Sequence, residues 1–352
     1  MDLAALVYTS GSTRRPRGVM LTHGNIVAAA TSIADYLELT ADDVILNVLP
    51  LSFDYGLYQV LLSFKSAGCL VLERAFVYPS TVLDTIARER VTGLPIVPMM
   101  AALLLRQDLA GYDISSLRYM TNTGAVLQPA HIEALRARMP HVKIFSMYGL
   151  TECKRVSYLP PEEIDRRPTS VGKPMDNVEV YLVAEDGRHL ATGVGELAIR
   201  GSNVMQGYWG APDDTARVLK PGRYPGEFVL HSGDIFRIDD EGYMYFLNRT
   251  DDVIKSRGQK VSPREVESVL HTVPGVLEAV VLAVSDPVLG EAIKAFVTLD
   301  GSCPVTEQQI ARYCTSKLED FMVPRSVEIV QHLPRTSSGK IARRALQLPS
   351  QN

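Results

Sequence analysis

Tyr8-Thr9-Ser10-Gly11-Ser12-Thr13-Arg14-Arg15-Pro16-Arg17-Gly18 is a loop of small hydroxyl residues, glycines and arginines. It follows an apolar run at 3–8 that predicts a strand. In such a loop, backbone N–H groups and hydroxyls approach the oxygens of a polyphosphate closely, and guanidinium groups neutralise their charge. It is not a Walker A loop, because Pro16-Arg17 stands where that motif has Gly-Lys. A flexible Ser/Gly turn with solvated arginines is the alternative interpretation.

Composition and charge exclude several classes of protein. The chain has 352 residues, a formal net charge of -4, 46% hydrophobic and 22% charged residues. These values predict a globular protein of about two domains and argue against a nucleic-acid binder. The apolar stretch 91–105 is too short and too interrupted by proline to span a membrane, and no signal peptide is visible. The four cysteines lack metal-site spacing, so we expect no zinc site, no disulfide framework and a cytoplasmic location.

Up to about residue 170 the sequence alternates strand and helix patterns. Thr22 is an expected N-cap for a helix over 23–37, and Pro129 an expected first-turn residue for a helix that precedes a strand at 142–148. Such alternation predicts a mostly parallel sheet with helices on its faces. Ligands of such sheets bind at loops beyond the carboxyl ends of the strands.

Further along, the pattern changes twice. Short strands with turn signals predict a β-rich subdomain at about 178–247. The last hundred residues predict a small α+β domain with capping boxes at Ser262/Glu265 and Thr306/Gln309. The predicted fold is therefore α/β, with a large domain at 1–248 made of α/β sheets and the β-rich subdomain, and a small C-terminal α+β lid domain at 249–352.

Five more motifs follow the first loop in order. They are Thr123-Gly124-Ala125, Met147-Tyr148-Gly149-Leu150-Thr151-Glu152, Ser232-Gly233-Asp234, Arg249-Thr250-Asp251-Asp252-Val253-Ile254-Lys255-Ser256-Arg257-Gly258, and Pro334-Arg335-Thr336-Ser337-Ser338-Gly339-Lys340. Together with the loop at 8–18, these motifs resemble the adenylate-forming superfamily, which includes acyl-CoA synthetases and peptide-synthetase adenylation domains. The stretch 148–155 also looks like acyl ligases associated with exopolysaccharide or exosortase clusters.

The resemblance implies a role for each motif. Thr151 donates to the α-phosphate, Glu152 binds Mg²⁺, and Lys340 bridges carboxylate and phosphate charge during adenylation. Asp251 is the implied hinge, and Lys255 and Gly258 belong to the loop of the thioester-forming step. The implied nucleotide-binding residues are Thr9, Ser10, Gly11, Ser12, Thr13, Arg17, Gly124, Ala125, Tyr148, Gly149, Asp234 and Arg249. Taken alone, several of these residues also suit ordinary turns or a solvated basic end.

The implied function is that of an ATP-dependent acid–thiol ligase. A carboxylic acid, expected to be a fatty or other acyl acid, becomes acyl-AMP and is then transferred to CoA or to the phosphopantetheine thiol of an acyl carrier protein. The acyl pocket is expected at 50–58 and 94–100. An amino-acid adenylation domain is an alternative, in which Asp54 holds the substrate amine.

Two departures from the family favour a third interpretation. Arg14 stands where the family has Gly, and Arg17 where it has Lys. Arginine keeps the charge but replaces a compact ammonium with a planar fork. Family members also carry a subdomain before the loop at 8–18. We therefore expect either a partner polypeptide that supplies this part, or a catalytically impaired fragment that still binds nucleotide or a partner.

Overall fold

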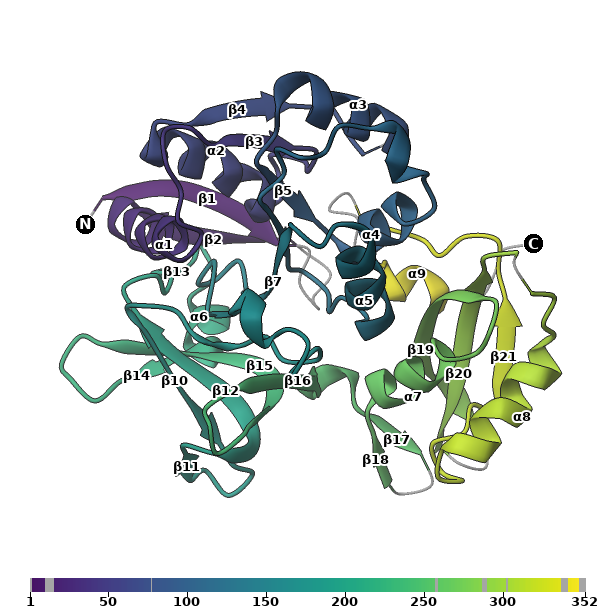
Figure 1. Ribbon diagram of the computed structural model, residues 1–352. Coiled ribbons are helices and arrows are strands. Elements are labelled where there is room, and N and C mark those ends of the chain that lie inside the picture. The colour runs from purple at the N-terminus through teal and green to yellow at the C-terminus, as the bar shows by residue number, and fades with distance from the viewer. Residues whose placement is uncertain are drawn as a thin grey trace. The chain divides into compact units, whose positions relative to one another are not determined.

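The computed structural model describes residues 2–9, 16–76, 78–256, 259–286, 290–301, 303–336 and 341–347. The chain divides into two compact units (Figure 1). Unit 1 comprises Met1–Ser232 and Phe236–Phe246, and unit 2 comprises Gly233–Ile235 and Leu247–Asn352. Each unit has a hydrophobic core of its own.

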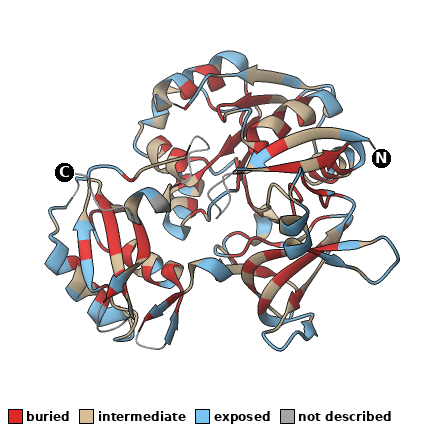
Figure 2. Ribbon diagram, turned by 180° about the vertical axis from the view of Figure 1, so that it is seen from behind, coloured by how far each residue is buried: buried red, intermediate tan, exposed pale blue. Residues whose placement is uncertain are grey.

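Strands and helices alternate through the first part of unit 1. They are β3 (Val44–Asn47), α2 (Asp54–Ser66), β4 (Cys69–Leu72), α3 (Pro79–Glu89), β5 (Gly93–Ile96), α4 (Pro98–Leu104), β6 (Tyr119–Asn122), α5 (Pro129–Arg138), β7 (Lys143–Tyr148), β8 (Ser157–Leu159) and β9 (Lys173–Pro174), with 3₁₀ turns at Leu109–Gly111 and Pro161–Glu163. The strands form one sheet in the order β4-β3-β5-β6-β7-β8-β9, parallel from β4 to β7. β5 and β6 are buried along their whole length, as Figure 2 shows for the central strands. The predicted α/β fold class is confirmed.

A hairpin precedes this sheet. β1 (Leu3–Thr9) pairs antiparallel with β2 (Arg17–Thr22), and β13 (Gly207–Tyr208) adds to the other side of β2. The hairpin places Thr9 and Arg17 opposite each other at its end. Residues 10–15 of the predicted phosphate loop lie outside the described residues.

Helix α1 (His23–Tyr36) begins at Thr22, as the sequence predicts. Thr22 Oγ1 accepts a hydrogen bond from the backbone N–H of Asn25 at 3.0 Å, and Asn25 Oδ1 accepts one from the N–H of Thr22 at 2.9 Å. This reciprocal pair satisfies two of the N–H groups that a helix start leaves unpaired. Asn25 Nδ2 also donates to the carbonyls of Ser202 and Val204, which ties the helix start to the segment before β13.

The rest of unit 1 is rich in β-strands. A six-stranded sheet has the order β11-β10-β12-β15-β14, with β16 paired to β15. Its strands are β10 (Val178–Val183), β11 (His189–Leu190), β12 (Gly193–Gly201), β14 (Leu219–Pro221), β15 (Phe228–Ile238) and β16 (Met244–Arg249), and α6 (Pro212–Val218) lies between β13 and β14. Residues 233–235 of β15 and 247–249 of β16 belong to unit 2.

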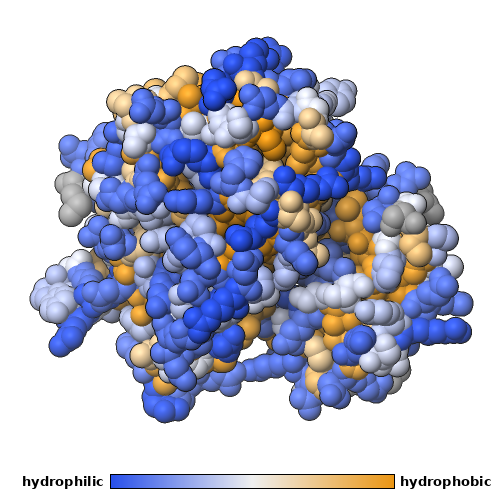
Figure 3. All heavy atoms as spheres, viewed as in Figure 1, coloured by the Kyte–Doolittle hydropathy of each residue, from blue (hydrophilic) through white to orange (hydrophobic). Residues whose placement is uncertain are grey.

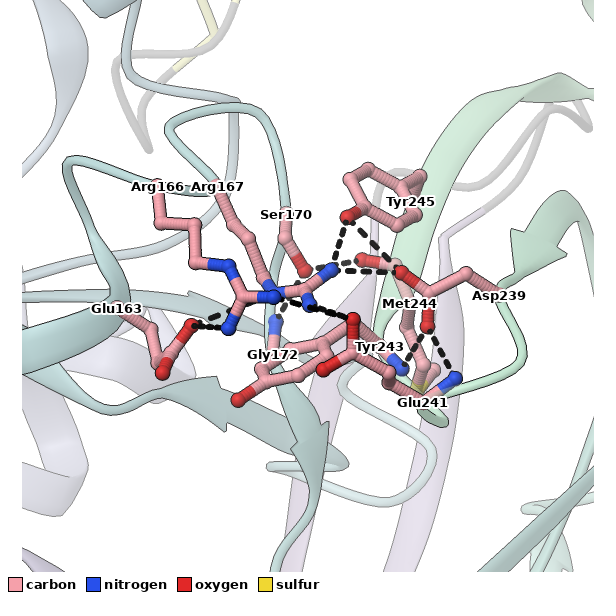
Figure 4. A network of polar contacts seen from close by, with 10 residues as sticks. All are labelled: Glu163, Arg166, Arg167, Ser170, Gly172, Asp239, Glu241, Tyr243, Met244 and Tyr245. Carbon is pink, nitrogen blue, oxygen red and sulfur yellow. Dashed lines mark hydrogen bonds and ion pairs between the residues drawn. The ribbon is translucent and has the colours of Figure 1, made fainter.

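The buried guanidinium of Arg167 connects the loop after β8 to the turn between β15 and β16 (Figure 4). It contacts two carboxylates on that turn, a tyrosine hydroxyl, a tyrosine ring and one carboxylate of its own loop. The partners are Asp239 (Nη1–Oδ2 2.8 Å), Glu241, Tyr245 (3.2 Å), the ring of Tyr243 (3.9 Å to the centroid) and Glu163 (Nε–Oε2 3.3 Å). A fork with several donors suits such a set of acceptors.

We expect Arg167→Met to lower the melting temperature by about 5 °C or more, since it leaves several acceptors without their donor. Its neighbour Arg166 is a matched control, because its exposed side chain makes only peripheral ion pairs with Glu163 and Glu241. Arg166→Met is expected to change the melting temperature by no more than about 1 °C. Differential scanning calorimetry measures both variants, and equal melting temperatures for the two would contradict the structural role of Arg167.

Unit 2 contains a mixed sheet in the order β18-β17-β20-β19, with β21 parallel to β20. Its elements are the 3₁₀ turn Thr250–Asp252, β17 (Ile254–Ser256), β18 (Gln259–Val261), α7 (Pro263–Leu270), β19 (Val276–Asp286), β20 (Gly290–Leu299), α8 (Glu307–Lys317), β21 (Ser326–Ile329) and α9 (Arg343–Gln347). The long β19–β20 hairpin packs against α7 and α8 through Val266, Val281 and Ile310, which are buried.

Of the two predicted capping boxes in unit 2, one forms. Thr306 Oγ1 accepts from the N–H of Gln309, and Gln309 Oε1 accepts from the N–H of Thr306. Ser262 is the N-cap position of α7 and Pro263 lies in its first turn, as predicted. The predicted capping box is wrong, because the Ser262 side chain makes no cap hydrogen bond and its hydroxyl donates to the carbonyl of Leu247 at 3.3 Å. A local motif does not reveal such a competing acceptor fifteen residues away in the chain.

The cysteines are all free, and they divide by exposure. Cys69 and Cys303 are exposed, whereas Cys153 and Cys314 are buried. Burial raises the pKa of Cys314 to about 11, and only a thiolate reacts rapidly with an aromatic disulfide. We therefore expect two of the four thiols to react within minutes in the native protein, and all four after unfolding. Rapid reaction of a Cys314→Ala variant at three thiols would contradict this assignment.

No helix among the described residues is long and apolar enough to cross a membrane. Hydrophilic side chains cover most of the face seen in Figure 3.

Candidate active site

The turn from β7 to β8 carries the Thr151-Glu152 motif and has an unusual backbone. A Cβ on Gly149 would lie 2.1 Å from the carbonyl oxygen of Lys154, so the close approach requires glycine. Lys154 has a φ of 59°, in the left-handed region that non-glycine residues rarely adopt. Asn203 Nδ2 donates to the carbonyls of Cys153 and Arg155 at 2.7 and 2.8 Å, which holds this shape. Such strained residues persist where their surroundings fix them, often at functional sites.

Glu152 is linked to Arg17 through one tyrosine. The Tyr208 hydroxyl donates to Glu152 Oε1 at 2.7 Å, and the Arg17 guanidinium lies 5.2 Å from the centre of the Tyr208 ring. Arg17 Nε is also 3.0 Å from Asp214 Oδ2 on α6. Burial and the Glu152 charge raise the pKa of Tyr208, so its hydroxyl stays protonated as a donor. The structure therefore brings Arg17, the last cation of the loop at 8–18, close to Glu152, the predicted Mg²⁺ ligand.

The carboxyl ends of β6 and β7 carry four of the predicted nucleotide-binding residues. β6 and β7 are parallel neighbours, with Asn122 opposite Ser146 in register. Gly124 has a φ of 84°, and Asn122 Nδ2 donates to the carbonyl of Ala125, which fixes the turn after β6. Tyr148 and Gly149 follow at the end of β7, and the Tyr148 ring packs 4.7 Å from that of Phe236, centre to centre. Parallel sheets bind ligands at this edge.

In unit 2, Asp234 and Arg249 lie side by side. Asp234 is 2% exposed, and its Oδ1 is 3.4 Å from Arg249 Nη1. Gly233, directly before Asp234, has a φ of 69°, a left-handed conformation that favours glycine.

The predicted hinge and thioester-loop residues also belong to unit 2. Asp251 lies in the exposed 3₁₀ turn directly after β16. Lys255 is exposed on β17, and its N–H donates to Glu291. Six predicted site residues lie outside the described residues: Ser10, Gly11, Ser12, Thr13, Gly258 and Lys340.

A Mg²⁺ ion fits the donors present. Among the described residues, no group of three or more His, Cys, Asp or Glu side chains gathers that is able to hold a metal by itself. Mg²⁺ is usually bound by one or two carboxylates together with phosphate oxygens and water, so Glu152 beside a bound polyphosphate is a sufficient protein ligand.

Charged side chains also line the region where the acyl pocket was expected. Lys154 Nζ donates to the Asp54 carbonyl at 3.1 Å and lies 3.3 Å from Asp54 Oδ2. Lys154 and Arg155 are both buried, next to the rings of Tyr55 and Tyr58. Sequence reasoning missed these two cations, as it missed Tyr208 and Asp214. The available signal was a pair of charges inside the otherwise apolar run that follows Glu152.

The fold and these strand-end groups define a nucleotide-binding enzyme of mixed α/β architecture. Family models match twice: AMP-binding enzyme at residues 1–209 and AMP-binding enzyme C-terminal domain at 265–340. The chain belongs to the AMP-binding enzyme family, within the adenylate-forming superfamily.

Three known proteins illustrate the similarity. A feruloyl-CoA synthase from an Amycolatopsis species is 36% identical over 97% of this chain and 68% of that protein. A long-chain-fatty-acid–CoA ligase from Bacillus subtilis is 32% identical over 98% of this chain and 61% of its own length. The Bacillus subtilis O-succinylbenzoate coenzyme A synthetase, solved with ATP and magnesium ion, is 32% identical with a TM-score of 0.85, over 97% of this chain and 69% of that one. The chain thus spans about two thirds of the length of these relatives.

Proposed function

We propose that this chain performs ATP-dependent ligation of a carboxylic acid to coenzyme A through an acyl-AMP intermediate. The observation that carries the proposal is the Glu152–Tyr208–Arg17 arrangement beside the carboxyl edge of the parallel sheet. It supplies a carboxylate for Mg²⁺ and a cation for phosphate, in a chain whose relatives are CoA ligases.

The reaction needs two displacements. First, a carboxylate oxygen attacks the α-phosphorus of ATP, and the bond to pyrophosphate breaks. A Mg²⁺ ion held by Glu152 would supply positive charge to the phosphates. Then a thiolate sulfur attacks the acyl carbon, and AMP leaves. In the first step, Arg17 and the backbone of the loop at 8–18 hold the phosphates, Thr151 donates to an α-phosphate oxygen, and Lys340 bridges the two anions.

Unit 2 acts as the lid in this proposal. Its turn at Asp251 absorbs the change of backbone angles between the two steps. Lys340 then serves adenylation, whereas Lys255 and Gly258 serve thioester formation. Asp234 and Arg249, which already contact each other, bind the ribose hydroxyls and the phosphate.

The remaining choices concern the partners and the location. Coenzyme A is the acceptor favoured by the names of the relatives, and a carrier-protein thiol is the alternative. A polypeptide corresponding to the rest of the relatives' length is a further proposed partner. Free cysteines, two of them exposed, suit a reducing compartment such as the cytoplasm.

The amino-acid adenylation alternative is disfavoured by Asp54. In that interpretation its carboxylate receives the substrate amine, yet Lys154 of this chain already lies 3.3 Å from it in a buried pair. A buried carboxylate that is neutralised by its own lysine offers little to a second cation.

The test is acid-dependent ATP–pyrophosphate exchange over fatty, aromatic, dicarboxylic and amino acids, followed by CoA-dependent release of AMP. The chain is assayed alone and with a co-expressed upstream segment of a relative. Exchange with a carboxylic acid supports the proposal. Nucleotide binding without exchange under either condition identifies an impaired fragment, and exchange with amino acids alone identifies an adenylation domain.

A further inference from the structure

Arg155 is a buried cation for which the described residues provide no anion. The residue is 2% exposed, and its Nε and Nη1 atoms lack a hydrogen-bond acceptor there. A guanidinium remains charged at any physiological pH, so it cannot avoid the cost of burial by losing its proton. Buried charges in proteins are normally paired, and this one has no carboxylate partner in the part of the chain that the structure describes.

The neighbouring groups do not supply the missing charge. The carboxylate of Asp54 is matched by Lys154 at 3.3 Å. The other contacts of Arg155 are with tyrosines, which carry no charge: its guanidinium lies 5.6 Å from the centre of the Tyr55 ring. Burial raises the pKa of Tyr36 to about 12, and the charge of Arg155 and its hydrogen bond to Tyr36 oppose this shift. Two buried cations and one buried carboxylate leave a net positive charge in this part of unit 1.

The position of this charge connects it with the acid substrate. Arg155 follows Glu152 by three residues on the β7–β8 turn, and its neighbour Tyr55 bonds through its hydroxyl to Thr121 near the carboxyl end of β6. This is the sheet edge at which the parallel fold binds ligands. Tyr55 also lies in the segment 50–58, where the acyl pocket was expected.

The local backbone keeps both cations inside. The left-handed conformation of Lys154 and the two hydrogen bonds from Asn203 fix the turn on either side of it. Apolar side chains would fill the same interior without an unpaired charge. The positions therefore fit binding of a ligand better than packing alone.

We propose that Arg155 is a specificity-determining residue that binds a second carboxylate of the acid substrate, so that the enzyme prefers dicarboxylic acids to unsubstituted fatty acids. This inference rests on the proposed ligase function. A carboxylate matches the guanidinium fork with two parallel hydrogen bonds and cancels its charge. The first carboxylate of the same molecule then goes to ATP. Lys154 is a positioning residue, because it keeps Asp54 from pairing with Arg155.

The experiment compares matched acids, hexanoate with adipate and octanoate with suberate, in ATP–pyrophosphate exchange. The wild-type chain is expected to favour one of the dicarboxylic acids. Arg155→Gln is expected to lower kcat/KM for that acid by about 10- to 100-fold, the range for one lost charged hydrogen-bonding partner. The same variant is expected to leave kcat/KM for the monocarboxylic acid unchanged or to raise it. Arg155→Lys restores part of the preference, and Arg188→Gln, at an exposed turn arginine, preserves it.

A second readout separates this inference from the ligase function. The favoured dicarboxylic acid is expected to raise the melting temperature of the wild-type chain but not of Arg155→Gln, whether or not exchange occurs. A wild-type preference for monocarboxylic acids, or no stabilisation by any dicarboxylic acid, overturns the proposal. If Arg155→Gln lowers kcat/KM equally for all acids and raises KM for ATP, the proposal is also overturned, because Arg155 then binds the nucleotide.

Discussion

Glu152→Gln is expected to lower kcat/KM for ATP–pyrophosphate exchange by at least about 100-fold, equivalent to several kcal/mol of transition-state stabilisation. The amide keeps the size and the hydrogen bond from Tyr208 but loses the negative charge that a hard divalent cation requires. The loss should shrink as the Mg²⁺ concentration rises, since a weaker ligand is partly compensated by mass action. Exchange kinetics over a series of Mg²⁺ concentrations measure this.

Two further variants control this experiment. Tyr208→Phe removes only the hydroxyl that orients Glu152. A change in such a supporting group typically lowers metal affinity or activity by about 10-fold or somewhat more. Glu133→Gln, on the exposed surface of α5, changes the same chemical group away from the site and should have no effect. Full activity of Glu152→Gln at low Mg²⁺ concentration would show that Glu152 is not a ligand of the metal.

The sequence predicts the architecture because its signals are local. Alternating strand and helix patterns predict a mostly parallel sheet covered by helices, and Thr22 and Thr306 cap helices through residues three positions away. Ser262 has the same local signature, but the Leu247 carbonyl competes for its hydroxyl. Local motifs fail where tertiary contacts offer a better partner.

The candidate site also combines residues that local motifs predict with partners that only the fold reveals. Thr151 and Glu152 are recognisable because their motif is contiguous, whereas the partners of the site residues are distant in sequence. Tyr208 is 56 residues from Glu152, and Asp54 is 100 residues from Lys154. The charge of Arg155 is visible in the sequence, but its burial with no carboxylate from the described residues beside it appears only once the fold is formed.

Lys340→Ala is expected to lower acyl-adenylate formation by about 100- to 1000-fold, the usual cost of losing one group that stabilises developing charge. An ammonium between carboxylate and phosphate offsets the repulsion of two anions that must approach each other. Thioester formation from preformed acyl-AMP begins after that approach, so this second half-reaction should stay within about threefold of wild type. Pyrophosphate exchange measures the first step, and CoA-dependent AMP release from synthetic acyl-AMP measures the second.

The informative result is the contrast between the two half-reactions. Lys317→Ala, at the exposed end of α8, removes a cation from the same unit and should alter neither step. Gly258→Val is expected to show the opposite pattern, with exchange retained and thiol attack slowed, since a side chain there obstructs the thiol. Opposite losses in the two variants follow only if one small unit serves both displacements in turn. Equal losses of both steps in Lys340→Ala would instead mean that the lysine stabilises the unit as a whole and does not act in adenylation alone.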